Sequence, residues 1–274
     1  MTILQAVLLG IVQGITEFLP ISSSGHLVLV PWILGWEFDL QTAFIFDVLV
    51  QWGTTLAVII YFWKDLWHMF IDAARNLLRG TPFATGKSRL AWLILLASIP
   101  AAIAGMLLKD LVAAAFINPL ASSVALLLTA CLMAWAEHGA TLRKRLFATT
   151  WVDAIWIGAF QVLALFPGIS RSGATISAGL WRGLKRTDAA RFSFFMAVPV
   201  MFGAGLVALR DLAAMPDPTA QIGPLIAGFI SAFIVGMLSI HWLLRYLARK
   251  PLRVFVIYCT VVGLVGIALY VLLH

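Results

Sequence analysis

The feature of this sequence that most restricts its fold is a series of long apolar runs separated by short polar segments. A helix needs about 20 apolar residues to cross the ~30 Å hydrocarbon core of a bilayer. Only 11% of the 274 residues are charged, too few to cover the surface of a water-soluble protein. The sequence therefore predicts an all-α polytopic membrane protein. Its transmembrane helices are expected at 43–63, 91–108, 118–136, 192–209, 222–244 and 253–273.

Two further apolar runs, at 1–34 and 151–181, are long enough to span a bilayer but are interrupted midway by Pro, Ser and Gly. The interruptions are FLPISSSGH at 18–26 and FPGISRSGATIS at 166–177. Because Pro and Gly break regular helices, each run is expected to form two short helices joined by a turn. The sequence thus predicts two re-entrant helix-turn-helix segments beside the six spans.

The distribution of basic residues predicts how the spans are oriented. Cytoplasmic loops of membrane proteins are enriched in Lys and Arg. Here 16 of the 19 basic residues lie in the segments 64–90, 138–150, 182–191 and 245–253, which are therefore expected in the cytoplasm. The loops near 36–41, 109–117 and 210–221 are then external, as are both termini. The loops then alternate between the two sides of the membrane without conflict, provided that 1–34 enters and leaves from outside and 151–181 enters and leaves from inside.

Four smaller features complete the classification. The stretch from Leu66 to Leu78 mixes aromatic and charged residues in the pattern of an amphipathic helix on the cytoplasmic surface, with a solvated loop as the alternative. No signal peptide is expected, because Lys64 is the first basic residue. The net charge of +7 does not indicate nucleic-acid binding, because no basic stretch carries interleaved aromatic residues. Cys131 and Cys259 lie inside apolar runs, so a structural disulfide is not expected.

The chain contains an internal repeat at an offset of 148 residues. Without a gap, this offset aligns Gly10, Gln13, Ile21, Ser22, Ser24, Gly25, Phe44 and Phe46 with Gly158, Gln161, Ile169, Ser170, Ser172, Gly173, Phe192 and Phe194. We expect one membrane domain made of repeat 1, about 1–137, and repeat 2, about 149–274. Each repeat holds three spans, an odd number, so the repeats should be inverted, with a site near the midplane where the broken helices meet. Chance agreement at a few small residues is the alternative.

The turn of the second repeat carries an arginine, Arg171, where the first repeat has Ser23. Placing Arg in a membrane costs ~2.5–3.5 kcal/mol, so it calls for a partner. A phosphate is a natural partner, because the guanidinium group offers bidentate hydrogen bonds to it. The alternative is an arginine neutralised for structural reasons by Glu17 or Asp47. In the first case, an anion cradle would be completed by Ser170, Ser172 and Thr175.

The turn of the first repeat carries an acidic and a basic side chain. Gln13 and Glu17 are four residues apart and share a helix face. Glu17 could hold a divalent cation, Mg²⁺ or Ca²⁺, beside a bound phosphate, or it could orient His26. His26 could act as the general base to a serine hydroxyl or as the acid to a leaving oxygen. The serines of this turn are Ser22, Ser23 and Ser24, and Asp47 and Gln51 on the next span are candidates to line the site.

These motifs resemble the two signatures of the undecaprenyl-diphosphate phosphatases of the bacitracin-resistance type. The signatures correspond to QGITEFLPISSSGH at 13–26 and PGISRSGATIS at 167–177, and further matches are FDVLVQWGTTLAV at 46–58 and FSFFMAVP at 192–199. The resemblance implies hydrolysis of a C55 isoprenyl diphosphate, which recycles the lipid carrier for cell-wall synthesis and confers bacitracin resistance. It also implies the bacterial inner membrane, with an active site that opens to the periplasmic face. A second copy of the chain is a candidate partner.

The resemblance also assigns roles to residues. Glu17 would bind the divalent metal, Ser23 would attack or contact the phosphate, and His26 would transfer protons. Arg171 would hold the diphosphate together with Ser170, Ser172 and Thr175. Gln13 stands where many members of the family carry Glu, so a metal would depend more on Glu17 and the substrate. The nucleophile stays open between Ser23, His26 and water.

Two other functions are associated with similar features. The type-2 phosphatidic-acid phosphatases also use a Ser-Arg element, but they require His six residues after the Arg and Asp four residues later. Ser177 and Trp181 occupy these positions, which excludes that family. A transporter or flippase for a lipid-linked phosphate is the alternative from another class, because inverted repeats are common in carriers.

Overall fold

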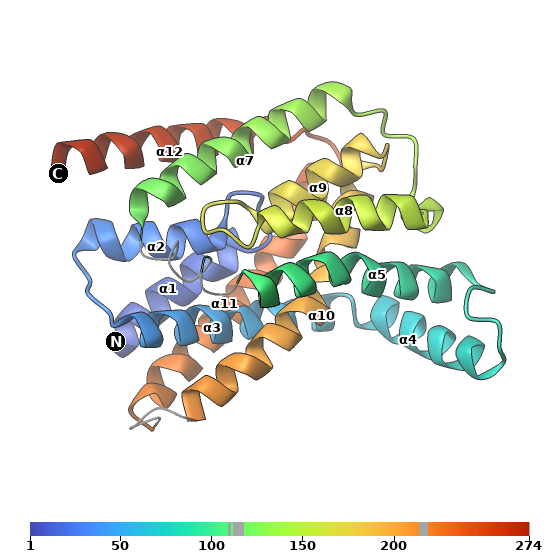
Figure 1. Cartoon of the computed structure of the whole chain (residues 1–274), viewed down its shortest axis with the longest axis horizontal. Coiled ribbons are helices and arrows are strands. Elements are labelled where there is room, and N and C mark those ends of the chain that lie inside the picture. Colours follow the sequence, from blue (N-terminus) through green and yellow to red (C-terminus); the bar gives the residue numbers. More distant parts are fainter. Residues whose placement is uncertain (109–110, 112–117, 214–218, 274) are drawn as a thin grey trace.

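The computed structural model describes residues 1–108, 111, 118–213 and 219–273, and its regular structure there is helical apart from one isolated β-bridge between Lys144 and Leu184 (Figure 1). Six helices are long and apolar enough to cross a membrane. They are α3 (Leu40–Tyr61), α5 (Gly86–Leu107), α7 (Pro119–Gly139), α10 (Arg186–Ala213), α11 (Thr219–Leu247) and α12 (Arg253–Leu273). The sequence prediction of an all-α protein with six spans is confirmed in the described part of the chain.

The helices extend a few residues beyond several of the predicted spans because capping residues, and not the limits of hydrophobicity, decide where a helix begins. The span predicted from residue 91 belongs to a helix that begins at Gly86. There the Thr85 hydroxyl accepts a hydrogen bond from the Ser88 amide at 3.1 Å, which satisfies one of the free donors of the first turn. Of the external loops expected near 109–117 and 210–221, residues 109–110, 112–117 and 214–218 lie outside the described residues, and 210–213 and 219–221 belong to α10 and α11.

The segment predicted to be amphipathic forms helix α4 (Trp63–Leu78), so the alternative of a solvated loop is wrong. One face of α4 exposes Trp63, Trp67 and Phe70, whose rings stack in sequence at centroid distances of 5.5 and 6.0 Å. Met69 is buried on the other side. An exposed aromatic face on a helix with charged residues is the composition expected of a helix at a membrane surface.

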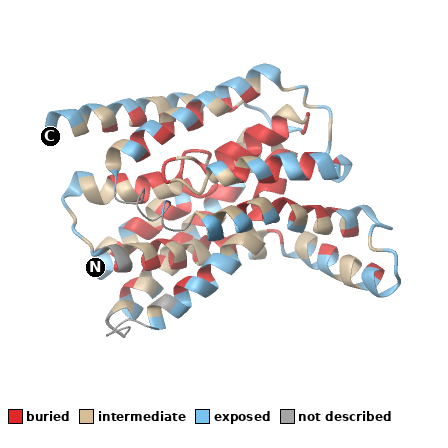
Figure 2. Ribbon diagram, in the orientation of Figure 1, coloured by how far each residue is buried: buried red, intermediate tan, exposed pale blue. Residues whose placement is uncertain are grey.

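The two interrupted apolar runs each form a pair of short helices joined by a turn. The first pair is α1 (Ile3–Thr16) and α2 (Ser23–Leu34), and the second is α8 (Trp151–Leu163) and α9 (Arg171–Trp181). At 1.5 Å per residue the longest of the four, with 14 residues, extends about 21 Å, less than the hydrocarbon core of a bilayer. Most residues of α9 are buried among the surrounding helices (Figure 2).

Small residues bring these short helices close to the long ones. Helix α1 packs on α11, where a Cβ added to Gly10 would lie 3.0 Å from the Gly228 Cα. Helix α8 packs on α5, where a Cβ added to Gly158 would lie 3.0 Å from the Ala97 Cα. Such contacts allow the close helix approach on which association in membranes relies, since lipid removes most of the hydrophobic driving force between helices.

Ion pairs tie together the basic segments predicted to be cytoplasmic, and the α4–α5 and α7–α8 connections lie at the same end of the molecule (Figure 1). The fully buried carboxylate of Asp153 accepts hydrogen bonds from Lys144 Nζ at 3.0 Å and Arg182 Nε at 2.6 Å. Arg186 pairs with Glu137 through both carboxylate oxygens. Burial by itself would raise the pKa of Asp153, but hydrogen bonds from Thr150, Arg182 and Lys144 hold this pKa below its usual value.

Replacing Asp153 by Ala is expected to lower the free energy of unfolding by about 2 kcal/mol, because hydrogen bonds to a charged group contribute in that range. The pKa of Asp153 is lowered in the folded state, so its stabilisation is present above the pKa of the unfolded state and is lost as the pH falls through the folded value. Thermal melts in detergent across pH 3–7 should therefore show a smaller loss of Tm in acid for Asp153→Ala than for the wild type. Glu37→Gln, at an exposed position, is the control. Equal melts for Asp153→Ala and the wild type at neutral pH would contradict this role.

Candidate active site

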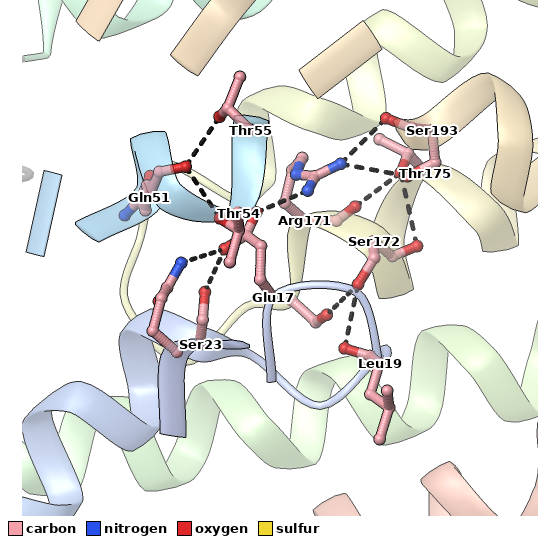
Figure 3. A network of polar contacts seen from close by, with 12 residues as sticks. Glu17, Leu19, Ser23, Gln51, Thr54, Thr55, Arg171, Ser172, Thr175 and Ser193 are labelled. Carbon is pink, nitrogen blue, oxygen red and sulfur yellow. Dashed lines mark hydrogen bonds and ion pairs between the residues drawn. The ribbon is translucent and has the colours of Figure 1, made fainter. Parts of the chain in front are cut away.

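Glu17 is the centre of a buried polar network between the two interrupted segments. It directly follows α1, and its side chain is 6% exposed. One carboxylate oxygen, Oε2, accepts hydrogen bonds from Gln13 Nε2 at 2.9 Å and from Ser23 Oγ at 2.8 Å. The other, Oε1, accepts from Arg171 Nη2 at 2.6 Å. Figure 3 shows Glu17 between Ser23 of the first segment and Arg171 of the second.

Arg171 begins helix α9 and joins three elements. Besides its ion pair with Glu17, its Nη1 donates to the Ser193 carbonyl at 3.0 Å and contacts the Ser193 hydroxyl at 3.3 Å. The third donor nitrogen, Nε, is buried without a hydrogen-bond partner among the described residues. Thr175, one turn further along α9, also donates to Ser193, at 2.7 Å. The arginine therefore has a fixed orientation and a spare N–H group.

The sequence offered two carboxylates that could neutralise the charge of Arg171, those of Glu17 and Asp47. The structure pairs Arg171 with Glu17. Asp47 is buried in α3, but no hydrogen bond or ion pair joins its side chain to the network in the described part of the chain. Gln51 lies one turn further along α3, and its backbone carbonyl accepts hydrogen bonds from Thr54 and Thr55 (Figure 3).

A serine caps the N-terminus of each helix that follows a turn. Ser22 Oγ accepts from the Gly25 amide at 3.2 Å, and Ser170 Oγ accepts from the Gly173 amide at 3.0 Å. Each cap also contacts a second hydroxyl in the same way: Ser22 lies 3.4 Å from Ser24, and Ser170 lies 3.2 Å from Ser172. Only part of each first turn is satisfied by these caps, so both helix N-termini keep backbone N–H groups that favour an anion.

The two turns meet at glycines. A Cβ added to Gly25 would lie 2.9 Å from the Gly168 Cα, so the backbones are in direct contact. Gly168 has φ +92°, a conformation that other residues rarely adopt, and its missing side chain leaves room for the Ser122 backbone. A hydrogen bond from Ser172 Oγ to the Leu19 carbonyl at 3.2 Å links the turns further. Glycine is thus required where the two segments bring Glu17 and Arg171 together.

His26 lies one turn into α2 but is not hydrogen-bonded to the serines' hydroxyl groups. Its Nδ1 lies 2.7 Å from the Ser22 carbonyl oxygen, and its Nε2 lies 2.7 Å from the hydroxyl of Tyr258 on α12. The interpretation of His26 as the direct base to a serine hydroxyl therefore has no hydrogen bond to support it. Ser23 instead donates to Glu17.

Several residues of this region could not be identified from the sequence. Ser193 lies inside the FSFFMAVP match at 192–199, but nothing in the sequence indicates that it contacts Arg171, and Tyr258 lies in an apolar span outside both motifs. Thr129 of α7 is similar: its hydroxyl accepts from the Ser170 amide at 3.0 Å and lies 3.2 Å from the Gly168 carbonyl. Their contribution depends on which helices become neighbours.

The oxygen atoms around Glu17 are compatible with a divalent cation completed by substrate. Gln13 Oε1 is buried without a hydrogen-bond partner among the described residues, so it offers a free oxygen donor beside the carboxylate. No group of three or more His, Cys, Asp or Glu residues suited to a metal occurs in that part of the chain. Mg²⁺ commonly takes one or two carboxylates together with phosphate oxygens, so two protein residues would suffice only with bound phosphate.

Comparisons with known proteins agree with the motifs. The family model described as "Bacitracin resistance protein BacA" matches residues 6–265. A protein of Methanosphaera stadtmanae named "Undecaprenyl-diphosphatase" is 41% identical over 280 residues, which cover 99% of each chain. A protein of Idiomarina loihiensis with the same name is 42% identical over 270 residues, 97% of this chain and 98% of the relative. The chain therefore belongs to the family of the bacitracin resistance protein BacA.

Proposed function

We propose that this protein hydrolyses undecaprenyl diphosphate to undecaprenyl phosphate and inorganic phosphate. The observation that carries the proposal is the buried network in which Glu17 meets both Ser23 and Arg171 at the start of two capped helices. The similarity over the whole chain to proteins named undecaprenyl-diphosphatase supplies the substrate. This reaction recycles the lipid carrier of cell-wall synthesis, and it accounts for the bacitracin resistance in the family's description.

Arg171 and the helix N-termini provide the binding groups for the diphosphate. The Nε of Arg171, which has no partner among the described residues, can donate to a phosphate oxygen while Nη1 stays on Ser193. The first turns of α2 and α9 add backbone N–H groups, with Ser22, Ser24, Ser170 and Ser172 at their starts. Phosphoryl transfer depends mainly on positioning and charge neutralisation, which such a site supplies.

Glu17 is the proton acceptor that the geometry favours for Ser23. The Ser23 hydroxyl already donates to Glu17 Oε2 at 2.8 Å, so its proton can pass to the carboxylate as the oxygen bonds to the terminal phosphorus. The bond from this phosphorus to the bridging oxygen breaks, and undecaprenyl phosphate leaves. Water then releases inorganic phosphate from the serine. If water attacks directly, Ser23 and Glu17 would orient it and take its proton.

A divalent cation, Mg²⁺ or Ca²⁺, would be held by Glu17 and Gln13 Oε1 together with substrate oxygens. When bound, it would neutralise the charge of the diphosphate. The chain's own residues then keep their tasks: Arg171 holds the terminal phosphate, and Ser23 remains next to Glu17. Asp47 and Gln51 are proposed to line the route to this site on α3.

We also propose that the two halves are inverted repeats with re-entrant segments at 1–34 and 151–181. The offset of 148 residues maps the first residues of α1 and α2, Ile3 and Ser23, onto those of α8 and α9, Trp151 and Arg171. It also maps the capping threonine Thr2 onto its counterpart in the second half, and both form a capping box. The packing agrees with this repeat: α1 of the first half packs on α11 of the second, and its counterpart α8 packs on α5, the counterpart of α11 in the first half.

The orientation follows from the charges. The basic segments lie at one end, which we assign to the cytoplasm of a bacterial inner membrane. Both termini then lie outside, and the site opens to the periplasmic face. The prenyl chain of the substrate would stay in the bilayer while its diphosphate reaches Arg171 between the helices.

The test is phosphate release by the purified protein in detergent, measured with a long-chain prenyl diphosphate in Mg²⁺, Ca²⁺ or chelator. Release that depends on divalent cation is expected. Ser23→Ala should keep lipid binding and lose phosphate release. Folded wild type that binds the lipid diphosphate without releasing phosphate would refute the phosphatase and favour the carrier, for which translocation in vesicles is the direct assay.

A further inference from the structure

We propose that Tyr258 is a positioning residue that holds His26, the histidine of the first motif, in one orientation and one tautomer, with its basic nitrogen on the Tyr258 hydroxyl. The inference rests on the proposed phosphatase function, to which it adds a residue of the last helix. Tyr258 lies outside both sequence motifs and reaches His26 from 232 positions away along the chain.

The hydrogen bonds of His26 fix its tautomer. The Ser22 carbonyl oxygen, 2.7 Å from Nδ1, can only accept, so Nδ1 must carry a proton. In the neutral ring Nε2 is then the unprotonated nitrogen. It lies 2.7 Å from the Tyr258 hydroxyl, which therefore donates to it. His26 is held as the Nδ1–H tautomer, with its basic nitrogen facing Tyr258.

The ring of His26 is also held in place by packing. The rings of His26 and Tyr258 are stacked, with centroids 5.6 Å apart and an angle of 18° between their planes. His26 is only 7% exposed. The next residue of α12, Cys259, places its Sγ 3.7 Å from the Pro20 carbonyl of the first turn. Two successive residues of α12 thus rest on the segment that carries Glu17 and Ser23.

Helix α12 is itself fixed against α7, which makes it a firm support. A Cβ added to Gly263 would lie 2.8 Å from the Ser123 carbonyl oxygen, so the two helices are in close contact. The second support of His26 is Ser22, the residue before α2. Its φ of 70° is unusual for a residue with a side chain, and its carbonyl receives both the backbone N–H and the ring N–H of His26.

A tyrosine hydroxyl suits this position because it can both donate and accept. While Nε2 is unprotonated, the hydroxyl donates to it; after Nε2 gains a proton, the new N–H donates to the same oxygen. Tyr258 therefore keeps the ring oriented in both protonation states. Ser23 lies three residues before His26 on the same face of α2, so the fixed imidazole is anchored one helix turn from the attacking group.

The experiment is a double-mutant cycle with Tyr258→Phe, His26→Ala and the double variant, measured as kcat and KM for phosphate release. Phe keeps the ring contact and removes only the hydroxyl. Tyr258→Phe should lower kcat about 10- to 100-fold, as loss of a group that orients a functional histidine does, with KM nearly unchanged. In the His26→Ala background it should have no further effect. Tyr270→Phe on the same helix is the matched control and should keep the wild-type kcat.

A second measurement is independent of activity. In protein labelled with ¹⁵N-histidine, the Nε2 resonance of His26, assigned by its absence in His26→Ala, should shift in Tyr258→Phe and not in Tyr270→Phe. An unchanged resonance, an unchanged kcat, or an equal loss of kcat in the presence and absence of His26 would overturn the inference. If His26→Ala retains full kcat, His26 has no role in the reaction and the inference fails with it. Phosphate release by the wild type in the same assay tests the proposed function separately from the role of Tyr258.

Discussion

Arg171→Ala is expected to reduce phosphate release by about 10³-fold or more, the scale of effect of arginines that stabilise the charge of a transferred phosphoryl group. The structure gives two reasons. Arg171 supplies the only guanidinium in the described network around Glu17, and its Nε is free to contact a phosphate oxygen. Arg171→Lys keeps the charge but loses the planar fork, so its activity should lie between those of the wild type and Arg171→Ala.

This substitution also removes the partner of a buried carboxylate, and stability must therefore be measured beside activity. Removing one partner of a buried ion pair typically costs about 3–5 kcal/mol. The double variant Arg171→Ala, Glu17→Ala should regain part of that stability without regaining activity. Arg210→Ala, at an exposed position of α10, is the matched control and should leave phosphate release unchanged. Near-normal release by folded Arg171→Ala would show that the arginine serves structure alone.

Glu17→Gln is expected to lower kcat by about 10²- to 10³-fold, within the range for loss of a general acid or base. The amide keeps the size of the side chain, but its single oxygen can accept from Ser23 or from Arg171 and not from both, because these donors contact different carboxylate oxygens. It can no longer take a proton from the Ser23 hydroxyl or hold a cation with a full negative charge. The residual activity should therefore lose its response to divalent cation and chelator. The assay is phosphate release across a titration of Mg²⁺ and Ca²⁺.

Glu37→Gln provides the control for charge alone, because Glu37 is exposed in the connection between α2 and α3. It should keep both the wild-type kcat and the wild-type cation dependence. A Glu17→Gln variant that still needs divalent cation as the wild type does would place the metal elsewhere. A Glu17→Gln variant with the wild-type kcat would show that Glu17 is not the proton acceptor of Ser23.

The six spans could be predicted because a membrane-spanning helix requires a run of consecutive apolar residues of a set length. The ends of the helices were predicted less well, because they depend on caps such as Thr85, whose hydrogen bond forms outside the apolar run. The two interrupted segments could be found for a similar local reason. Ser22 and Ser170 are recognisable as helix starts next to turn residues, and the structure uses both as caps.

The pairing of Gln13 with Glu17 was also within reach of the sequence, because residues four apart share a helix face. The choice between partners for Arg171 was not. Glu17 and Asp47 both offered a carboxylate in a buried segment, and only the packing of α9 beside the end of α1 selects Glu17. For the same reason, Tyr258 could not be predicted from the sequence as the hydrogen-bond partner of His26.

The sequence by itself determined the membrane class, the six spans, the two interrupted segments and the residue types that can handle a phosphate. These depend on hydrophobic length, helix capping and helical spacing, which act over a few neighbouring residues. The tertiary structure alone decided that Glu17 pairs with Arg171, 154 positions away, and that His26 pairs with Tyr258. Such contacts depend on which helices become neighbours. That choice is made by close packing at residues such as Gly25 and Gly168, whose role appears only when the backbones meet.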